Sequence, residues 1–292
     1  MAEPVPPPVP PVDYVRRWHD IVERRRVQMD NAYEAAGRTS GDYWARRAKQ
    51  YRQALHDRAD ADPFFIRVRG AATRETTVLD VGAGTGRHTL ALAPHVAHVT
   101  AVDPSAAMLG LLREDAAARS LGNITAVESG WMEADAGAHD IVICSHVLYP
   151  IADVVPFLRK LTSHARARVF VYLRIDPLPT DMGLWAEFYG EPLQPQPGAH
   201  DLLNLLAQIG VMADLEVVQH RFTWTFADLD EAEAQVSNTL CLRDDDAAGR
   251  EKLRALLERT LVRHENGRIG PDVGSARSAI ISWPGEAAAA GG

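Results

Sequence analysis

The sequence predicts a doubly wound α/β fold, with a mostly parallel sheet of seven strands whose last strand is antiparallel. Short apolar runs alternate with helix-like segments between residues 77 and 174, an order typical of parallel sheets. A glycine-rich turn joins the first of these runs to a helix-like segment. The chain has 292 residues, 46% of them hydrophobic and 24% charged, which is enough for one large domain or two small ones with a buried core.

The elements are expected in the following order. Residues 1–12 hold six of the 18 prolines and are expected to form a disordered, extended arm. A helical cap is expected over residues 13–60, with two helices separated by the GRTSG stretch at 37–41. Strands are expected at 77–81, 98–102, 124–127, 140–145 and 168–174, and helices at 87–93, 106–119 (with Ser105 as N-cap) and 154–164.

The remainder of the chain is expected to complete the sheet and cover one edge of it. Five prolines and several aromatic residues follow residue 174, which favours an irregular lid over 175–200. A helix at 201–209, a strand at 215–226, helices at 228–240 and 247–264 and a last strand at 278–283 come next. The main domain is therefore placed at 61–284, with lid segments at about 175–200 and 227–266, and residues 285–292 as a disordered tail.

Charge and cysteine content exclude several classes of partner. Acidic residues outnumber basic ones by 39 to 31, giving a net charge of −8, so the surface field disfavours nucleic acid. Cys144 and Cys241 are the only two cysteines, too few and too far apart for a disulfide framework or a thiolate metal cluster. No histidine or carboxylate cluster has metal-ligand spacing, so no metal is expected. No membrane span or signal peptide is recognisable, and a cytoplasmic location is expected.

The most informative stretch is VLDVGAGTGRHTL at residues 78–90. Three alternate glycines, Gly82, Gly84 and Gly86, stand where a buried strand turns into a helix, a turn that lets the backbone approach a ligand. Asp103 ends the next strand, where a carboxylate accepts hydrogen bonds from ribose hydroxyls. The spacing departs from the dinucleotide pattern G-x-G-x-x-G. Asp80 adds a negative charge that favours a cationic ligand over a pyrophosphate.

These residues resemble the class I S-adenosylmethionine-dependent methyltransferases, which have a Rossmann-like fold, and the resemblance runs from residue 78 to about residue 174. It implies that the D-x-G-x-G-x-G turn binds the methionine part of S-adenosylmethionine and that Asp103 binds the ribose. It further implies a set of residues around the adenosine and near the sulfur: Pro104, Ser105, Met108, Gly130, Trp131, Met132 and Ser145. For Met108 and Trp131 the competing interpretation is packing in the core.

The fourth strand reads DIVICSHVLYPI at residues 140–151. It lacks the Asn/Asp-Pro-Pro-aromatic signature of enzymes that methylate nucleic-acid bases or glutamine, which disfavours those acceptors and leaves a small-molecule acceptor. His146 follows this strand at the edge that faces the ligand, and a histidine there is a candidate catalytic base for a hydroxyl acceptor. The alternative is a histidine that only packs beside the cofactor.

A second cluster, DYWARRAKQY, lies in the N-terminal helical region. Tyr43 and Arg47 share a helical face and Trp44 lies beside them, so by analogy with the family these three are expected to touch the cofactor or the acceptor. The alternative is a helix that packs on the sheet through its aromatic residues.

The leading hypothesis is an enzyme that transfers a methyl group to an oxygen or nitrogen of a small molecule. Two alternatives stay open: a non-catalytic protein that binds S-adenosylmethionine or S-adenosylhomocysteine, and an NAD(P)-dependent oxidoreductase. The identity of the acceptor, the use of a general base, the pathway and any homo-oligomer are not derivable from the sequence.

Overall fold

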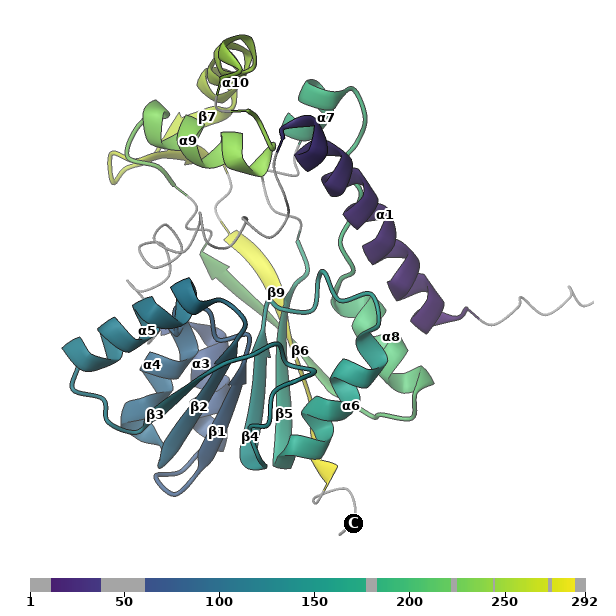
Figure 1. Ribbon diagram of the computed structural model, residues 1–292, viewed down its shortest axis with the longest axis vertical. Helices are drawn as coiled ribbons and strands as arrows, with labels where there is room; N and C mark the ends of the chain where they lie inside the picture. The colour runs from purple at the N-terminus through teal and green to yellow at the C-terminus, as the bar shows by residue number, and fades with distance from the viewer. Residues whose placement is uncertain are drawn as a thin grey trace, which may run out of the picture.

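The computed structural model describes residues 12–37, 61–176, 183–221, 225–243, 245–272 and 275–286. Its central feature is a seven-stranded sheet in the order β3-β2-β1-β4-β5-β9-β6 (Figure 1). The strands are β1 (Thr77–Val81), β2 (His98–Asp103), β3 (Ile124–Glu128), β4 (His139–Ser145), β5 (Ala165–Arg174), β6 (Asp214–Arg221) and β9 (Ser275–Pro284). The first five pair in parallel, and β9 is antiparallel to both of its neighbours. The predicted fold class is confirmed.

The strand order creates a switch point at β1, which has β2 on one side and β4 on the other. The chain leaves β1 and β2 for helices on one face of the sheet and leaves β4 for a helix on the opposite face. In open parallel sheets the crevice for ligands lies at such a point, outside the carboxyl ends of the strands. The glycine turn after β1 and the carboxylate that ends β2 are placed there.

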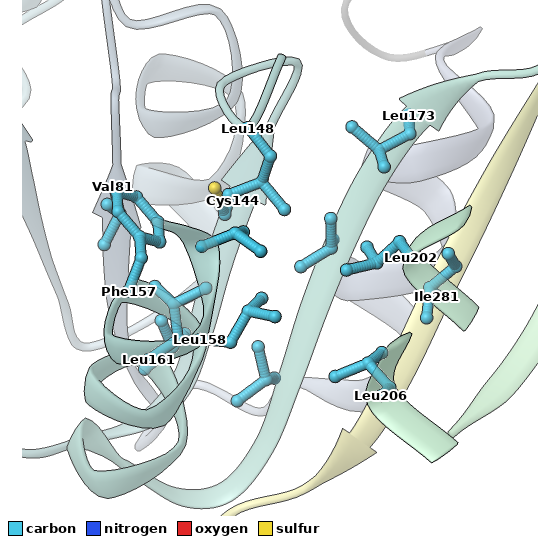
Figure 2. Close-up of a cluster of buried hydrophobic side chains, with 14 of the residues drawn as sticks. Val81, Cys144, Leu148, Phe157, Leu158, Leu161, Leu173, Leu202, Leu206 and Ile281 are labelled. Atoms are coloured by element: carbon cyan, nitrogen blue, oxygen red, sulfur yellow. The ribbon is translucent and has the colours of Figure 1, made fainter. Parts of the chain in front are cut away.

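One face of the sheet is covered by α3 (Pro63–Ala71), α4 (Arg87–Leu92) with the short 3-10 helix η2 (Ala93–His95), and α5 (Ala106–Ala118). The other face packs against α6 (Val154–His164) and α8 (Ala199–Gln208). Figure 2 shows Phe157, Leu158 and Leu161 of α6 in this second core, and Leu202 and Leu206 of α8 beside Ile281 of β9. Strands buried on both faces explain why their sequences are continuous apolar runs.

The helix α1 (Tyr14–Ala35) lies outside α6 and α8 (Figure 1). Trp18 is fully buried in the core cluster, and its indole Nε1 donates a hydrogen bond to the carbonyl of Ile151 at 2.8 Å. The guanidinium of Arg17 pairs with Asp201 at the start of α8, 2.8 Å away. The first of the two expected N-terminal helices is therefore present. The second falls in residues 38–60, outside the described residues.

A smaller core, separate from those on the two faces of the sheet, stands beyond the carboxyl ends of the parallel strands (Figure 1). It combines the end of α1 with α7 (Leu184–Tyr189), α9 (Leu229–Thr239), α10 (Ala247–Thr260), and the hairpin of β7 (Leu261–Arg263) and β8 (Ile269–Pro271). We call this group of elements the cap. Its own buried leucines and Phe226 give it an apolar interior separate from that of the sheet.

Several expected boundaries differ from those observed. The helix expected at 247–264 ends at Thr260, because residues 261–263 turn into β7 and pair with β8. The strand expected at 215–226 ends at Arg221, and Phe226 forms an isolated bridge with Ile269. Within the expected lid, Leu184–Tyr189 is helical between two glycines with left-handed backbone, Gly183 and Gly190. The helix α3 was not predicted; it begins with Asp62 as N-cap and Pro63 at its first position.

Candidate functional site

The glycine turn after β1 has a left-handed backbone at all three glycines, with φ of +74° at Gly82, +56° at Gly84 and +84° at Gly86. A Cβ at Gly82 would lie 2.3 Å from a Val147 methyl carbon, and a Cβ at Gly86 would lie 2.7 Å from Cγ of Leu112. A Cβ at Gly84 would meet no atom within 4 Å. Packing inside the protein therefore explains two of the glycines, whereas the space beside Gly84 is open.

Asp103 closes this turn from the neighbouring strand. The backbone N–H of Gly84 donates to its Oδ2 at 2.9 Å, and the N–H of Ser105 donates to its Oδ1 at 2.8 Å. The side chain is 9% exposed, and burial raises the pKa of this carboxyl above its usual value. Each oxygen keeps a further lone pair. The carboxylate is thus held in place by backbone amides while it can still accept hydrogen bonds from a ligand.

Asp80 is a second buried carboxyl near this turn. It accepts a hydrogen bond from the hydroxyl of Thr89 at 2.7 Å and is 2% exposed. Burial raises the pKa of Asp80 to about 7, and the negative charge of Asp103 acts in the same direction. A buried carboxyl whose pKa is raised by burial and by a nearby negative charge is stabilised in its ionised form by a bound cation.

The residues expected around the adenosine lie in two loops at the carboxyl ends of β2 and β3. Ser105 caps α5 as expected, its hydroxyl accepting from the N–H of Met108. Met108 is buried and Met132 is 48% exposed. Trp131 packs in the core against α6, where its Nε1 donates to the carbonyl of Phe157 at 3.3 Å. The Trp131 indole is therefore engaged in the core, and its backbone lies beside Gly130 in the loop.

His146 follows β4 with a left-handed backbone, φ +59°, a conformation that clusters at functional sites in residues other than glycine. Its N–H donates to the carbonyl of Tyr172 at 2.9 Å, and its Nδ1 lies 2.9 Å from the hydroxyl of Tyr149. That hydroxyl accepts the backbone N–H of Arg174 at 2.8 Å. Burial, then the nearby Arg174 and Arg87, hold the pKa of His146 well below its usual value. The imidazole is neutral at pH 7.

His88 of α4 contacts Ser145, the last residue of β4. The Nε2 of His88 lies 3.1 Å from the hydroxyl of Ser145, and its ring packs edge-on against Phe64 at 4.9 Å between centroids. Burial lowers the pKa of His88 to about 4. Next to it, the guanidinium of Arg87 pairs with the buried carboxylate of Asp62 at 2.6 Å. This cluster joins α3 and α4 to the end of β4.

The structure thus brings Asp80, the three glycines, Asp103, Ser105, Ser145 and His146 to one edge of the sheet. Tyr43, Trp44 and Arg47 lie outside the described residues. Sequence reasoning did not single out Arg174 and Tyr172, which stand at the same edge. Their signal was available, because both lie in the last three residues of the fifth predicted strand, whose carboxyl end faces the ligand.

Among the residues that the structure describes, no three His, Cys, Asp or Glu side chains are grouped as metal ligands would be. No described helix is both long enough and apolar enough to cross a membrane.

Comparison with known proteins gives a domain and a fold. Residues 78–167 match a family model described as "Methyltransferase domain". A search of curated protein sequences gave no match. Among solved structures, magnesium protoporphyrin IX methyltransferase from Synechocystis PCC 6803 with bound SAH has a TM-score of 0.51 at 15% identity, covering 88% of this chain and 99% of its own. A putative methyltransferase from Bacillus halodurans C-125 has a TM-score of 0.50 at 15% identity, covering 75% and 96%.

Proposed function

We propose that this chain, whose residues 78–167 match a methyltransferase-domain family model, transfers the methyl group of S-adenosylmethionine to an oxygen or nitrogen of a small molecule. The main support is that, at the switch point of the sheet, the Asp103 carboxylate accepts the N–H of Gly84, a residue whose added Cβ would meet no protein atom within 4 Å.

The described residues fit this cofactor. Asp103 accepts hydrogen bonds from the two ribose hydroxyls, and the backbone of Gly82, Gly84 and Gly86 holds the methionine part. Asp80 supplies negative charge that attracts the ammonium and sulfonium groups. The same charge would repel a pyrophosphate. The adenosine and the sulfur are bounded by the remaining residues of the two loops and of β4: Pro104, Ser105, Met108, Gly130, the backbone of Trp131, Met132 and Ser145. When bound, the cofactor supplies an electrophilic methyl group.

We expect cofactor affinity to depend on pH through Asp80. Its pKa of about 7 means that it is largely protonated at pH 6 and ionised at pH 8. A cationic ligand favours the ionised form, so the affinity for S-adenosylmethionine rises with pH, by up to roughly tenfold between pH 6 and pH 8. Calorimetric titrations at both values check this. Any titration of the ligand itself affects the Asp80→Asn variant equally, so the affinity of this variant should rise less with pH. Equal pH profiles of affinity for the two proteins would contradict the role of Asp80.

The chain's own contribution to the reaction is alignment and, for a hydroxyl acceptor, removal of a proton. Holding the nucleophile in line with the methyl group and the sulfur supplies much of the rate enhancement. His146 is neutral, so it can accept a proton at Nε2 when Nδ1–H donates to Tyr149. The left-handed backbone and the hydrogen bond to Tyr149 hold the ring in one orientation.

Replacing His146 by Gln should separate catalysis from binding. We expect methyl transfer to a hydroxyl acceptor to fall by about 10²–10⁴, with the affinity for S-adenosylhomocysteine changed less than threefold. Turnover and calorimetric titration measure the two quantities. A loss of cofactor affinity equal to the loss of turnover would instead make His146 a residue that packs beside the cofactor.

We propose that the cap and the N-terminal helical region cover the acceptor. The cap stands over the carboxyl edge of the sheet (Figure 1), where it would enclose the acceptor together with the expected helical region at 13–60. Tyr43, Trp44 and Arg47 stay predicted contacts of the cofactor or acceptor. Both cysteines are buried free thiols, which supports a reducing, cytoplasmic compartment.

Following a labelled methyl group tests the proposal as a whole. The protein is incubated with methyl-labelled S-adenosylmethionine and separate fractions of metabolites, protein and RNA. Label in the metabolite fraction, with one S-adenosylhomocysteine formed per methyl transferred, is the expected result. Label confined to protein or RNA would overturn the choice of a small molecule. Binding of S-adenosylmethionine without release of S-adenosylhomocysteine in any fraction would favour the non-catalytic alternative.

A further inference from the structure

Arg174 is the last residue of β5 and stands beside His146. Its guanidinium lies over the ring of Tyr149, with Cζ 4.7 Å from the ring centroid. Its backbone N–H donates to the hydroxyl of Tyr149, the same hydroxyl that contacts Nδ1 of His146. Arg174, Tyr149 and His146 therefore form one cluster at the carboxyl ends of β4 and β5.

The charge of Arg174 is not balanced within the described part of the chain. Arg166 and Arg168 on the same strand pair with Asp140 and Asp214. Arg174 has no such ion pair among the described residues, although it is half-buried. Because a partly buried guanidinium is less well solvated than one in water, an anion beside it is favoured.

Two acidic residues in this part of the fold are already paired with other arginines. Asp176, two residues further on, binds the guanidinium of Arg277 at 2.7 Å and also accepts its backbone N–H. Asp62, the buried acid on the α3 side, pairs with Arg87. Among the described residues, no acid is therefore paired with the positive charge beside His146, and an anionic ligand can bind there.

The position of Arg174 separates it from the cofactor. In the sheet order, β4 stands between β1, which carries the glycine turn, and β5, which ends in Arg174. Two strand spacings amount to roughly 10 Å. Arg174 thus lies on the side of His146 away from the glycine turn, on the side that remains for an acceptor.

We propose that Arg174 binds an anionic group of the acceptor, a carboxylate or a phosphate, and thereby selects acidic small molecules as substrates. This inference rests on the proposed function. The planar guanidinium offers paired N–H donors that match either anion, and the Tyr149 ring below it fixes the plane in which they point. An acceptor anchored at Arg174 presents its nucleophile next to His146.

Small aromatic probes test this without knowledge of the natural acceptor. Benzoate, benzamide and phenyl phosphate are titrated into the protein saturated with S-adenosylhomocysteine, and binding is followed by ligand-observed NMR. We expect benzoate or phenyl phosphate to bind at least tenfold more tightly than neutral benzamide, and the better of the two identifies the anion.

Variants of two arginines on the same strand provide the comparison. Arg174→Met should abolish the preference for the anionic probe, and Arg174→Lys should retain part of it. Arg166→Met removes the same charge from the other end of β5 and should leave the preference unchanged. The affinity for S-adenosylhomocysteine should stay within threefold in all three variants.

Three results would overturn the inference. One is equal binding of the charged and neutral probes to the unchanged protein, and another is a preference that survives Arg174→Met. The third is a loss of S-adenosylhomocysteine affinity of tenfold or more in Arg174→Met, which would assign Arg174 to the carboxylate of the cofactor. Failure of the unchanged protein to bind S-adenosylhomocysteine would instead overturn the proposed function, and the inference with it.

Discussion

Replacing Asp103 by Ala should weaken the binding of S-adenosylhomocysteine by at least about 100-fold. Two hydrogen bonds from ribose hydroxyls to a charged carboxylate are lost, each contributing about 1.5–3 kcal/mol, and a loss of about 3 kcal/mol in total corresponds to more than 100-fold in affinity. The N–H groups of Gly84 and Ser105 also lose their acceptor, so the turn itself becomes less well held. Calorimetric titration of the variant measures the change.

Asp140→Ala is the matched control for this effect. Asp140 also ties a backbone amide of a neighbouring strand, accepting the N–H of Thr77 at 2.7 Å, but it stands at the amino-terminal end of β4, the opposite edge of the sheet. It should lower stability without changing the affinity for S-adenosylhomocysteine. An Asp103→Ala protein that is folded and binds as tightly as the unchanged protein would contradict the ribose assignment.

Replacing Gly84 by Ala should strongly weaken cofactor binding while the protein still folds. The added methyl group meets no protein atom within 4 Å, so the cost to folding is limited to the left-handed backbone, about 1 kcal/mol. The same methyl group occupies the space proposed for the methionine part of the cofactor. Forcing an extra methyl group into an occupied space costs roughly 2 kcal/mol or more. We therefore expect the affinity for S-adenosylhomocysteine to fall by at least about 30-fold.

Gly137→Ala provides the same backbone strain elsewhere. Gly137 has φ +67° and a Cβ there would also meet no atom within 4 Å, but it lies in the loop that leads into β4. Thermal unfolding should shift by a similar amount in both variants, and only Gly84→Ala should lose binding. Retained binding in Gly84→Ala would place the ligand away from the turn.

The sheet and its helices were predictable because local patterns and tertiary packing agree there. Residues 154–164 were expected as a helix with those bounds and form α6, whose apolar face fits the core. Residues 261–263 were expected to continue a helix, yet they form β7, since pairing with β8 supplies backbone hydrogen bonds that helix propensity does not register. The helix at Leu184–Tyr189 was not predicted, because prolines and glycines surround it in the sequence. It forms because it packs Trp185 into the cap.

The part of the candidate site that belongs to the glycine-rich motif and the end of the second strand was predictable from the sequence. The glycine turn and Asp103 are neighbours because the chain order fixes which strand ends meet. For Trp131 the sequence left core and ligand open, and the indole packs in the core because its N–H finds the Phe157 carbonyl there. The sequence placed Arg174 at the end of a predicted strand, but its proposed role also depends on which acids pair with its neighbours, and that is a property of the folded chain.

The most direct test of the proposed cofactor is a calorimetric titration of the unchanged protein with S-adenosylhomocysteine and, in parallel, with NAD. We expect micromolar binding of S-adenosylhomocysteine, with NAD at least 100-fold weaker, because Asp80 and the G-x-G-x-G spacing disfavour a pyrophosphate. Tighter binding of NAD than of S-adenosylhomocysteine would contradict it.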